Sequence, residues 1–76
     1  MEHKGYDYSK RFQLHAIDAE GRFHMLCAMP TLGAAAGERW RYPMARARYY
    51  VLDELTGNKC STKAALSPEM RSTLIP

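Results

Sequence analysis

Apolar and polar residues alternate in two stretches of the chain, which is the pattern of β-strands that have one covered face. Residues 11–18, RFQLHAID, form the first stretch, and residues 22–29, RFHMLCAM, form the second. Asp18, two further residues and then Gly21 separate the apolar runs, and this spacing suits a type I turn followed by a left-handed residue. The sequence therefore predicts an antiparallel hairpin.

A regular register for this hairpin pairs Asp18 with Arg22, Ile17 with Phe23, His15 with Met25, Leu14 with Leu26 and Phe12 with Ala28. One face then carries Phe12, Leu14, Ala16, Leu26 and Ala28. The other face carries Ile17, Phe23, Met25, Cys27 and Met29, with Gln13 and His15 among them. If the methionines and the phenylalanine of this second face are exposed together, they form an adaptable patch that could bind a protein. We expect it instead to pack under a second hairpin or a C-terminal helix, because such residues are usually covered.

A second turn of the same kind lies at residues 54–58, ELTGN. A hairpin around it pairs Asp53 with Lys59, Leu52 with Cys60, Val51 with Ser61 and Tyr50 with Thr62. A helix over residues 43–55 is the alternative, because Pro43 suits a first helical position and Gly57 suits a C-terminal cap. That helix would place Asp53 and Glu54 in its last turn, where the helix dipole disfavours acids. We therefore prefer the strand.

The predicted fold is mainly β, a small antiparallel sheet or partly open barrel of two hairpins with a short C-terminal helix. An α+β fold with a helix at 43–55 is the alternative. Residues 30–37, PTLGAAAG, are predicted to be a loop with a helical turn at the alanines. Ser67, Pro68 and Glu69 resemble a helix start, which predicts a helix over 68–74. Residues 1–10 lack periodicity and are expected to be a mobile arm, followed by one small globular domain over 11–76.

The charge balance limits the class of partner. The 76 residues hold 11 Lys and Arg against 8 Asp and Glu, a net charge of +3, which is too small an excess for a histone-like polyanion binder. The first ten residues contain no apolar run, so we expect a cytoplasmic protein with no membrane anchor. A domain this small buries little surface, and forming a homodimer is one way to bury more.

Cations and aromatic rings are concentrated in residues 39–50, RWRYPMARARYY, which contain no acid. Arginine binds phosphates and carboxylates through a planar set of donors, and aromatic rings stack on bases or on arginine. We call this stretch the basic aromatic segment. Its candidate binding residues are Arg39, Trp40, Arg41, Tyr42, Arg46, Arg48 and Tyr49.

Two functions follow from this segment. The first is a non-enzymatic module that binds single-stranded nucleic acid, with the arginines on phosphates and the rings on bases. The second is a regulator or inhibitor of the phage or mobile-element kind that docks on an acidic protein surface, with a homodimer as a further hypothesis. The competing structural interpretation puts Trp40 and the tyrosines in the core, and it is the one that a single tryptophan in a small domain favours.

Catalytic and cofactor chemistry receives little support. On a regular strand His24 and Cys27 point to opposite faces, so their spacing predicts no shared metal ion. A nucleophile pair such as Cys27 with His15, or Cys60 with His24, lacks any third residue to orient it. We therefore expect no metal, no cofactor and no enzymatic activity.

Overall fold

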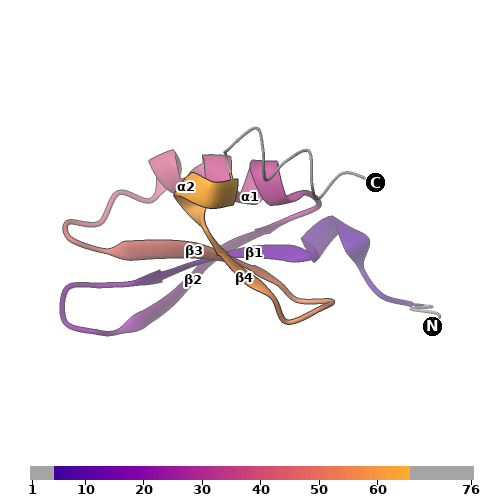
Figure 1. Ribbon diagram of the computed structural model, residues 1–76, viewed down its shortest axis with the longest axis horizontal. Helices are drawn as coiled ribbons and strands as arrows, with labels where there is room; N and C mark the ends of the chain where they lie inside the picture. The colour runs from indigo at the N-terminus through magenta and orange to yellow at the C-terminus, as the bar shows by residue number, and fades with distance from the viewer. Residues whose placement is uncertain (1–4, 66–76) are drawn as a thin grey trace.

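Four antiparallel strands form one sheet in the computed structural model, which describes residues 5–65 of the chain (Figure 1). The strands are β1 (Phe12–Ile17), β2 (Phe23–Met29), β3 (Arg48–Asp53) and β4 (Lys59–Ser61). Their order across the sheet is β2-β1-β3-β4, so β1 lies between its hairpin partner and β3. The mainly β prediction is confirmed, as a single open sheet. The alternative helix over 43–55 is wrong, because β3 lies there.

Three short helical segments lie on one face of the sheet: α1 (Leu32–Gly37), the 3-10 helix η2 (Glu38–Arg41) and α2 (Thr62–Ala65) (Figure 1). The predicted helical turn at the alanines is α1, and Thr31 Oγ1 caps it by accepting from Ala34 N at 3.1 Å. A further 3-10 helix, η1 (Tyr8–Lys10), precedes β1. The predicted helix over 68–74, and residues 1–4 of the predicted arm, lie outside the described residues.

The first hairpin follows the predicted register only near its turn. Ile17 pairs with Phe23 and His15 with Met25, and Gly21 has the left-handed φ of 81° that the turn requires. A β-bulge then shifts the pairing, so that Leu14 lies opposite Cys27 and Phe12 opposite Met29. The predicted pairs Leu14–Leu26 and Phe12–Ala28 are therefore wrong, because one extra residue on β2 moves every later side chain to the other face.

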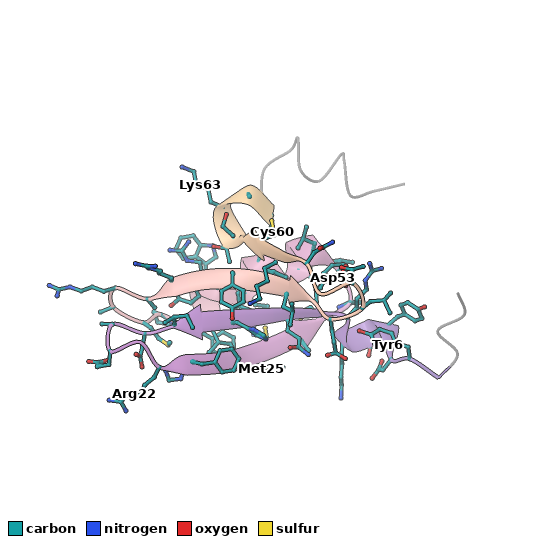
Figure 2. All side chains as sticks on the ribbon, turned by 60° about the horizontal axis from the view of Figure 1, so that its bottom comes forward. Tyr6, Arg22, Met25, Asp53, Cys60 and Lys63 are labelled. Atoms are coloured by element: carbon teal, nitrogen blue, oxygen red, sulfur yellow. The ribbon has the colours of Figure 1, made fainter. Side chains whose placement is uncertain are left out.

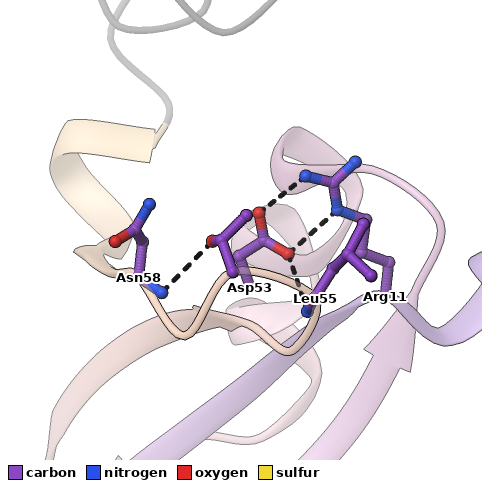
Figure 3. A network of polar contacts seen from close by, with 5 residues as sticks. Arg11, Asp53, Leu55 and Asn58 are labelled. Atoms are coloured by element: carbon purple, nitrogen blue, oxygen red, sulfur yellow. Dashed lines mark hydrogen bonds and ion pairs between the residues drawn. The ribbon is translucent and has the colours of Figure 1, made fainter. Parts of the chain in front are cut away.

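The second hairpin is displaced by one residue from the predicted register. Lys59 lies opposite Leu52, not Asp53, and Cys60 lies opposite Val51. Asp53 instead binds Arg11 through two hydrogen bonds, from Nε at 2.9 Å and from Nη2 at 2.8 Å (Figure 3). The Asp53 carboxylate also accepts from Leu55 N at 3.1 Å, which fixes the start of the turn. Thr62, predicted to continue the strand, begins α2.

The core lies between the sheet and the helices. Leu14 and Val51 are its only large side chains that are fully buried among the described residues, and the other fully buried apolar residues are alanines. They are Ala16, Ala35, Ala36 and Ala65. Small residues let α1 and α2 approach the strands closely, but they bury little area, so the core contributes little stability for the size of the chain.

Candidate functional site

The basic aromatic segment runs from η2 through a loop into β3, so its side chains do not share one surface. Within β3, Arg48 and Tyr50 lie on the sheet face opposite the helices, whereas Tyr49 and Val51 lie on the helix side. This is the alternation that the sequence predicts for a strand. Arg46 precedes the strand and has a left-handed φ of 61°, which is uncommon for a residue other than glycine.

Tyr49 holds the loop that leads into β3. Its hydroxyl donates to the carbonyl oxygen of Tyr42 at 2.5 Å and accepts from Met44 N at 2.9 Å. Both rings are half-buried and pack against the core. The structural interpretation is therefore right for Tyr42 and Tyr49: part of the segment's aromatic content fixes the backbone that carries the arginines.

Trp40 differs from the tyrosines because 77% of it is exposed. The expectation that the single tryptophan lies in the core is wrong, since η2 turns its side chain outward at the surface. The Arg39 guanidinium carbon lies 5.6 Å from the centre of the Trp40 ring and 4.9 Å from that of the Tyr49 ring. Arg39 Nη1 also donates to Thr62 Oγ1 at 3.3 Å, which holds the guanidinium between the two rings.

Arg39, Trp40 and Tyr49 line one shallow depression of about 350 Å³, together with Pro43, Met44 and Ala45. Its lining contains one cation, two rings and no carboxylate. An exposed indole beside a fixed guanidinium can stack on a planar group while the cation neutralises a nearby negative charge.

The remaining arginines of the segment are placed differently. Arg41 Nε pairs with Glu38 at 2.7 Å, on a side chain that is 77% exposed, so part of its charge is neutralised. Arg46 and Arg48 line a second depression of about 370 Å³ beside the turn of the first hairpin, with Ile17, Asp18, Ala19 and Gly21. The seven candidate residues thus do not form one surface. Arg39 and Trp40 lie at the Trp40 depression, Tyr42 and Tyr49 hold the loop, Arg41 is paired with Glu38, and Arg46 and Arg48 lie beside the hairpin turn.

The sheet face opposite the helices carries a second group of aromatic side chains, which we call the open face (Figure 2). His15 lies at its centre, 5% exposed, with the Phe23 ring 4.9 Å away on one side and the Tyr50 ring 5.2 Å away on the other. Phe23 is 56% exposed and Met25 48% exposed. The expectation that this apolar patch is covered does not hold for Phe23 and Met25 within residues 5–65, since α1, η2 and α2 lie on the other face (Figure 1).

The bulge decides which predicted patch residues reach the open face. Phe23 and Met25 precede the bulge and lie there, whereas Cys27 and Met29 follow it and pack against the core. Sequence reasoning missed Tyr50 and Lys59 as neighbours of this patch, because only the pairing of β1 with β3 and of β3 with β4 places them there. The alternation of residues 48–52 indicates that Arg48 and Tyr50 share one face of their strand. It does not indicate which other strand lies next to this one.

A chain of hydrogen bonds fixes His15 on the open face. Gln13 Nε2 donates to Glu54, so Gln13 Oε1 accepts from His15 Nε2 at 2.8 Å. His15 Nδ1 is then the acceptor for the Tyr50 hydroxyl at 3.2 Å. Burial, followed by the charge of Lys59, lowers the pKa of His15, so the neutral ring that fits this chain is the favoured form.

The cysteines and histidines are the side chains that could support nucleophilic catalysis or bind a metal ion. Cys27 is on the helix side and His15 on the open face, so this pair does not meet. Burial raises the pKa of both thiols, which disfavours the reactive thiolate. The bulge places His24 on the same side as Cys27, contrary to the prediction from a regular strand, but His24 binds Asp18 at 2.8 Å. Within residues 5–65 no three such side chains gather to hold a metal ion.

Comparison with known proteins found no matching family model, no significantly similar curated protein and no significantly similar solved structure. None of the helices in the described part of the chain has the length and apolar character needed to cross a lipid bilayer.

Proposed function

We propose that this protein is a non-enzymatic binding module that holds single-stranded nucleic acid through its basic aromatic segment. The observation that carries the proposal is Trp40, 77% exposed beside the fixed guanidinium of Arg39. A large ring left in water on so small a domain costs free energy, and stacking on a base would recover it.

The division of the segment supports a strand of several nucleotides rather than one small ligand. Trp40 would stack on a base, Arg39 would neutralise the adjoining phosphate, and Arg46 and Arg48 would meet the backbone farther along. Tyr49 and Tyr42 would hold the loop that spaces these groups. Flexible single strands can follow such a surface, because every base has a π-face and every nucleotide a phosphate.

The test is fluorescence anisotropy of labelled single-stranded DNA and RNA oligonucleotides, measured at low and at moderate salt. We expect saturable binding that weakens as salt rises, with Trp40→Ala reducing affinity but leaving the slope of log K against log salt unchanged. Tyr8→Ala is the matched control, because Tyr8 is also exposed, at 49%, and lies on η1 away from the segment. Binding that ignores salt, or no binding at all, would refute the proposal.

A regulator that docks on an acidic protein surface is the second candidate, acting like the first in the cytoplasm. The observation that favours it is the exposed pair Phe23 and Met25, since apolar side chains beside arginines are typical of protein interfaces. A stoichiometric protein complex that is lost in Trp40→Ala and Phe23→Ala, with no oligonucleotide binding, would select this candidate. A homodimer is the third, and light scattering over a wide concentration range tests it.

A further inference from the structure

The open face lies outside the basic aromatic segment except for Arg48 and Tyr50, and it is built differently from the Trp40 depression. Cross-strand neighbours place Phe23, Ile17 and Arg48 in one row and Met25, His15 and Tyr50 in the next. Lys59 extends from β4 over the Tyr50 ring, with Nζ 5.5 Å from the ring centre. The rings and the thioether thus run from β2 across β1 to β3, and both cations lie on the β3–β4 half of the face, before and after Tyr50 along the strand.

The charges on this face are suited to an anionic partner. Within residues 5–65, neither Arg48 nor Lys59 forms an ion pair, so both cations are available. Two acids lie near the ends of the face, and each has a partner. Glu54 accepts from Gln13, and Asp18 accepts from His24 and from the backbone N–H groups of Glu20 and Arg22.

The aromatic centre is also rigid. His15 is wedged between Phe23 and Tyr50 at interplanar angles of 85° and 78°, and its ring is hydrogen-bonded on both nitrogens. A ring that is held in place loses little conformational freedom when a planar group stacks on it. Phe23, at 56% exposed, and Met25, at 48% exposed, remain accessible beside this fixed centre.

We propose that the open face is a second base-stacking surface, on which bases of a single strand pack against Phe23, Met25 and Tyr50 while Arg48 and Lys59 hold the adjoining phosphates. This inference rests on the proposed function, because it extends the same strand. Arg48 belongs to the basic aromatic segment, lies in the outer row of the open face and lines the depression beside the hairpin turn with Arg46, so it joins the open face to that depression. A second copy that met the molecule through this same face would bring Arg48 and Lys59 against like charges, whereas nucleic acid supplies phosphates, so nucleic acid is favoured over a second copy.

The experiment compares two methyl groups by NMR during titration with a single-stranded oligonucleotide. The Met25 methyl reports on the open face, and the Met44 methyl reports on the Trp40 depression, which it helps to line. Met25→Leu and Met44→Leu assign the two signals. We expect both methyls to shift with the same saturation curve, and Phe23→Ala to weaken binding about 5- to 150-fold, the effect of losing one stacked base.

Each other outcome has a fixed meaning. A shift of Met44 alone, with Phe23→Ala matching Tyr8→Ala in affinity, overturns the open-face site and leaves the proposed function standing. A shift of Met25 alone supports the open face and removes the Trp40 depression from the proposed function. No shift and no anisotropy change refute both. Dimerisation that Phe23→Ala abolishes, with Met25 unmoved by oligonucleotide, assigns the face to a second copy and overturns the inference.

Circular dichroism and a urea unfolding curve of Phe23→Ala complete the test. Since more than half of Phe23 is exposed, we expect this variant to keep the wild-type spectrum. If Phe23→Ala fails to fold, Lys59→Ala provides the test, because Lys59 is exposed on β4 and its loss should not unfold the protein. We expect Lys59→Ala to reduce the slope of log K against log salt for oligonucleotide binding. A slope unchanged by Lys59→Ala would contradict the inference.

Discussion

Arg11 and Asp53, 42 positions apart in the sequence, form a two-point ion pair that joins the start of β1 to the end of β3. The side chains are 30% and 14% exposed, so water screens the pair only in part. The carbonyl of Arg11 also accepts from Glu54 N at 2.9 Å, which continues the pairing of the two strands beyond their assigned ends. This contact fastens β1 to β3 at the end of β3 that leads into the second turn (Figure 3).

The pair should be measurable by a double-mutant cycle in urea. We expect Arg11→Ala to lower the free energy of unfolding by about 1–2 kcal/mol, and Asp53→Ala to lower it further. The difference arises because Asp53 also accepts from Leu55 N, which the alanine leaves unpaired. Arg41→Ala is the matched control on an exposed pair and should change stability by less than about 0.5 kcal/mol. A coupling energy near zero would contradict the structure at this end of the sheet.

Acid should weaken the same contact. The hydrogen bonds from Arg11 hold the pKa of Asp53 below its ordinary value of 3.8. A carboxyl group with a lowered pKa in the folded state stabilises the protein above the unfolded-state pKa, and this stability is lost as pH falls through the folded-state pKa. We therefore expect the free energy of unfolding to decline steeply below about pH 4. The decline should be shallower in Arg11→Ala, as followed by urea unfolding at successive pH values.

His15 should produce a separate decline at milder acidity. Its pKa is lowered from 6.5 by burial and by Lys59, so the unfolded chain takes up a proton before the folded protein does. The neutral ring therefore stabilises the fold fully above about pH 6.5, and stability falls as pH drops below that value, by at most about 1.4 kcal/mol per pH unit.

Replacement of His15 isolates this effect. In His15→Gln the dependence between pH 7.5 and 5 should disappear, although stability at pH 7.5 should also fall because two hydrogen bonds change. If the free energy of unfolding of the wild-type protein were constant between pH 7.5 and 5, His15 would not be held neutral on the open face.

Tyr49→Phe tests whether the Tyr49 hydroxyl stabilises the loop that leads into β3. Loss of the hydroxyl leaves Met44 N without its acceptor and the Tyr42 carbonyl without its donor, so we expect a cost of about 1–3 kcal/mol. Hydrogen exchange should accelerate in residues 42–47. Tyr8→Phe is the control, because the Tyr8 side chain is half exposed and its hydroxyl should matter little. Equal stability of the two variants would remove the structural role of Tyr49.

Trp40 gives a direct optical test of the surface. Its emission should be that of an indole in water, and acrylamide should quench it efficiently, because the side chain is 77% exposed. Trp40→Ala should change the free energy of unfolding by no more than about 0.5 kcal/mol. A blue-shifted emission that resists quenching would instead show that Trp40 is buried in the core.

The cations offer a quantitative prediction for binding. Arg48→Ala should reduce the slope of log K against log salt by about 0.7 for single-stranded nucleic acid, the value for one phosphate contact. Lys10→Ala removes the same charge from η1, at the other end of β1 from Arg48, and should leave the slope almost unchanged. Equal effects of the two variants would mean that net charge, not a local contact, determines binding.

The sequence predicts the local features of this fold and misses the non-local ones. The first turn followed from Asp18 and Gly21, because that turn needs a left-handed residue and glycine provides it at low cost. Nothing in the sequence indicates the bulge after Met25, since Leu26 and Cys27 are apolar like the residues around them. In the displaced second hairpin Asp53 pairs with Arg11 instead of Lys59, a contact that no pattern near ELTGN could indicate.

The candidate site shows the same limit. Composition located the basic aromatic segment, but it could not separate the exposed Trp40 from the half-buried Tyr42 and Tyr49, because burial depends on which side of η2 and β3 each residue occupies. A signal was available for α2, whose start at Thr62 follows a capping serine: Ser61 Oγ accepts from Ala64 N at 3.1 Å. The strand pattern through residue 62 concealed it.

The strand order also determines how this sheet can meet other chains at its margins. β2 and β4 are the outermost strands, and an unpaired outer strand invites further strands to add to it, which leads to aggregation. β4 is only three residues long, and β2 is interrupted by the bulge, so neither presents a long, flat row of backbone donors and acceptors. The irregularity that disturbs the register of the first hairpin thus also protects the protein against growing into a fibril-like sheet.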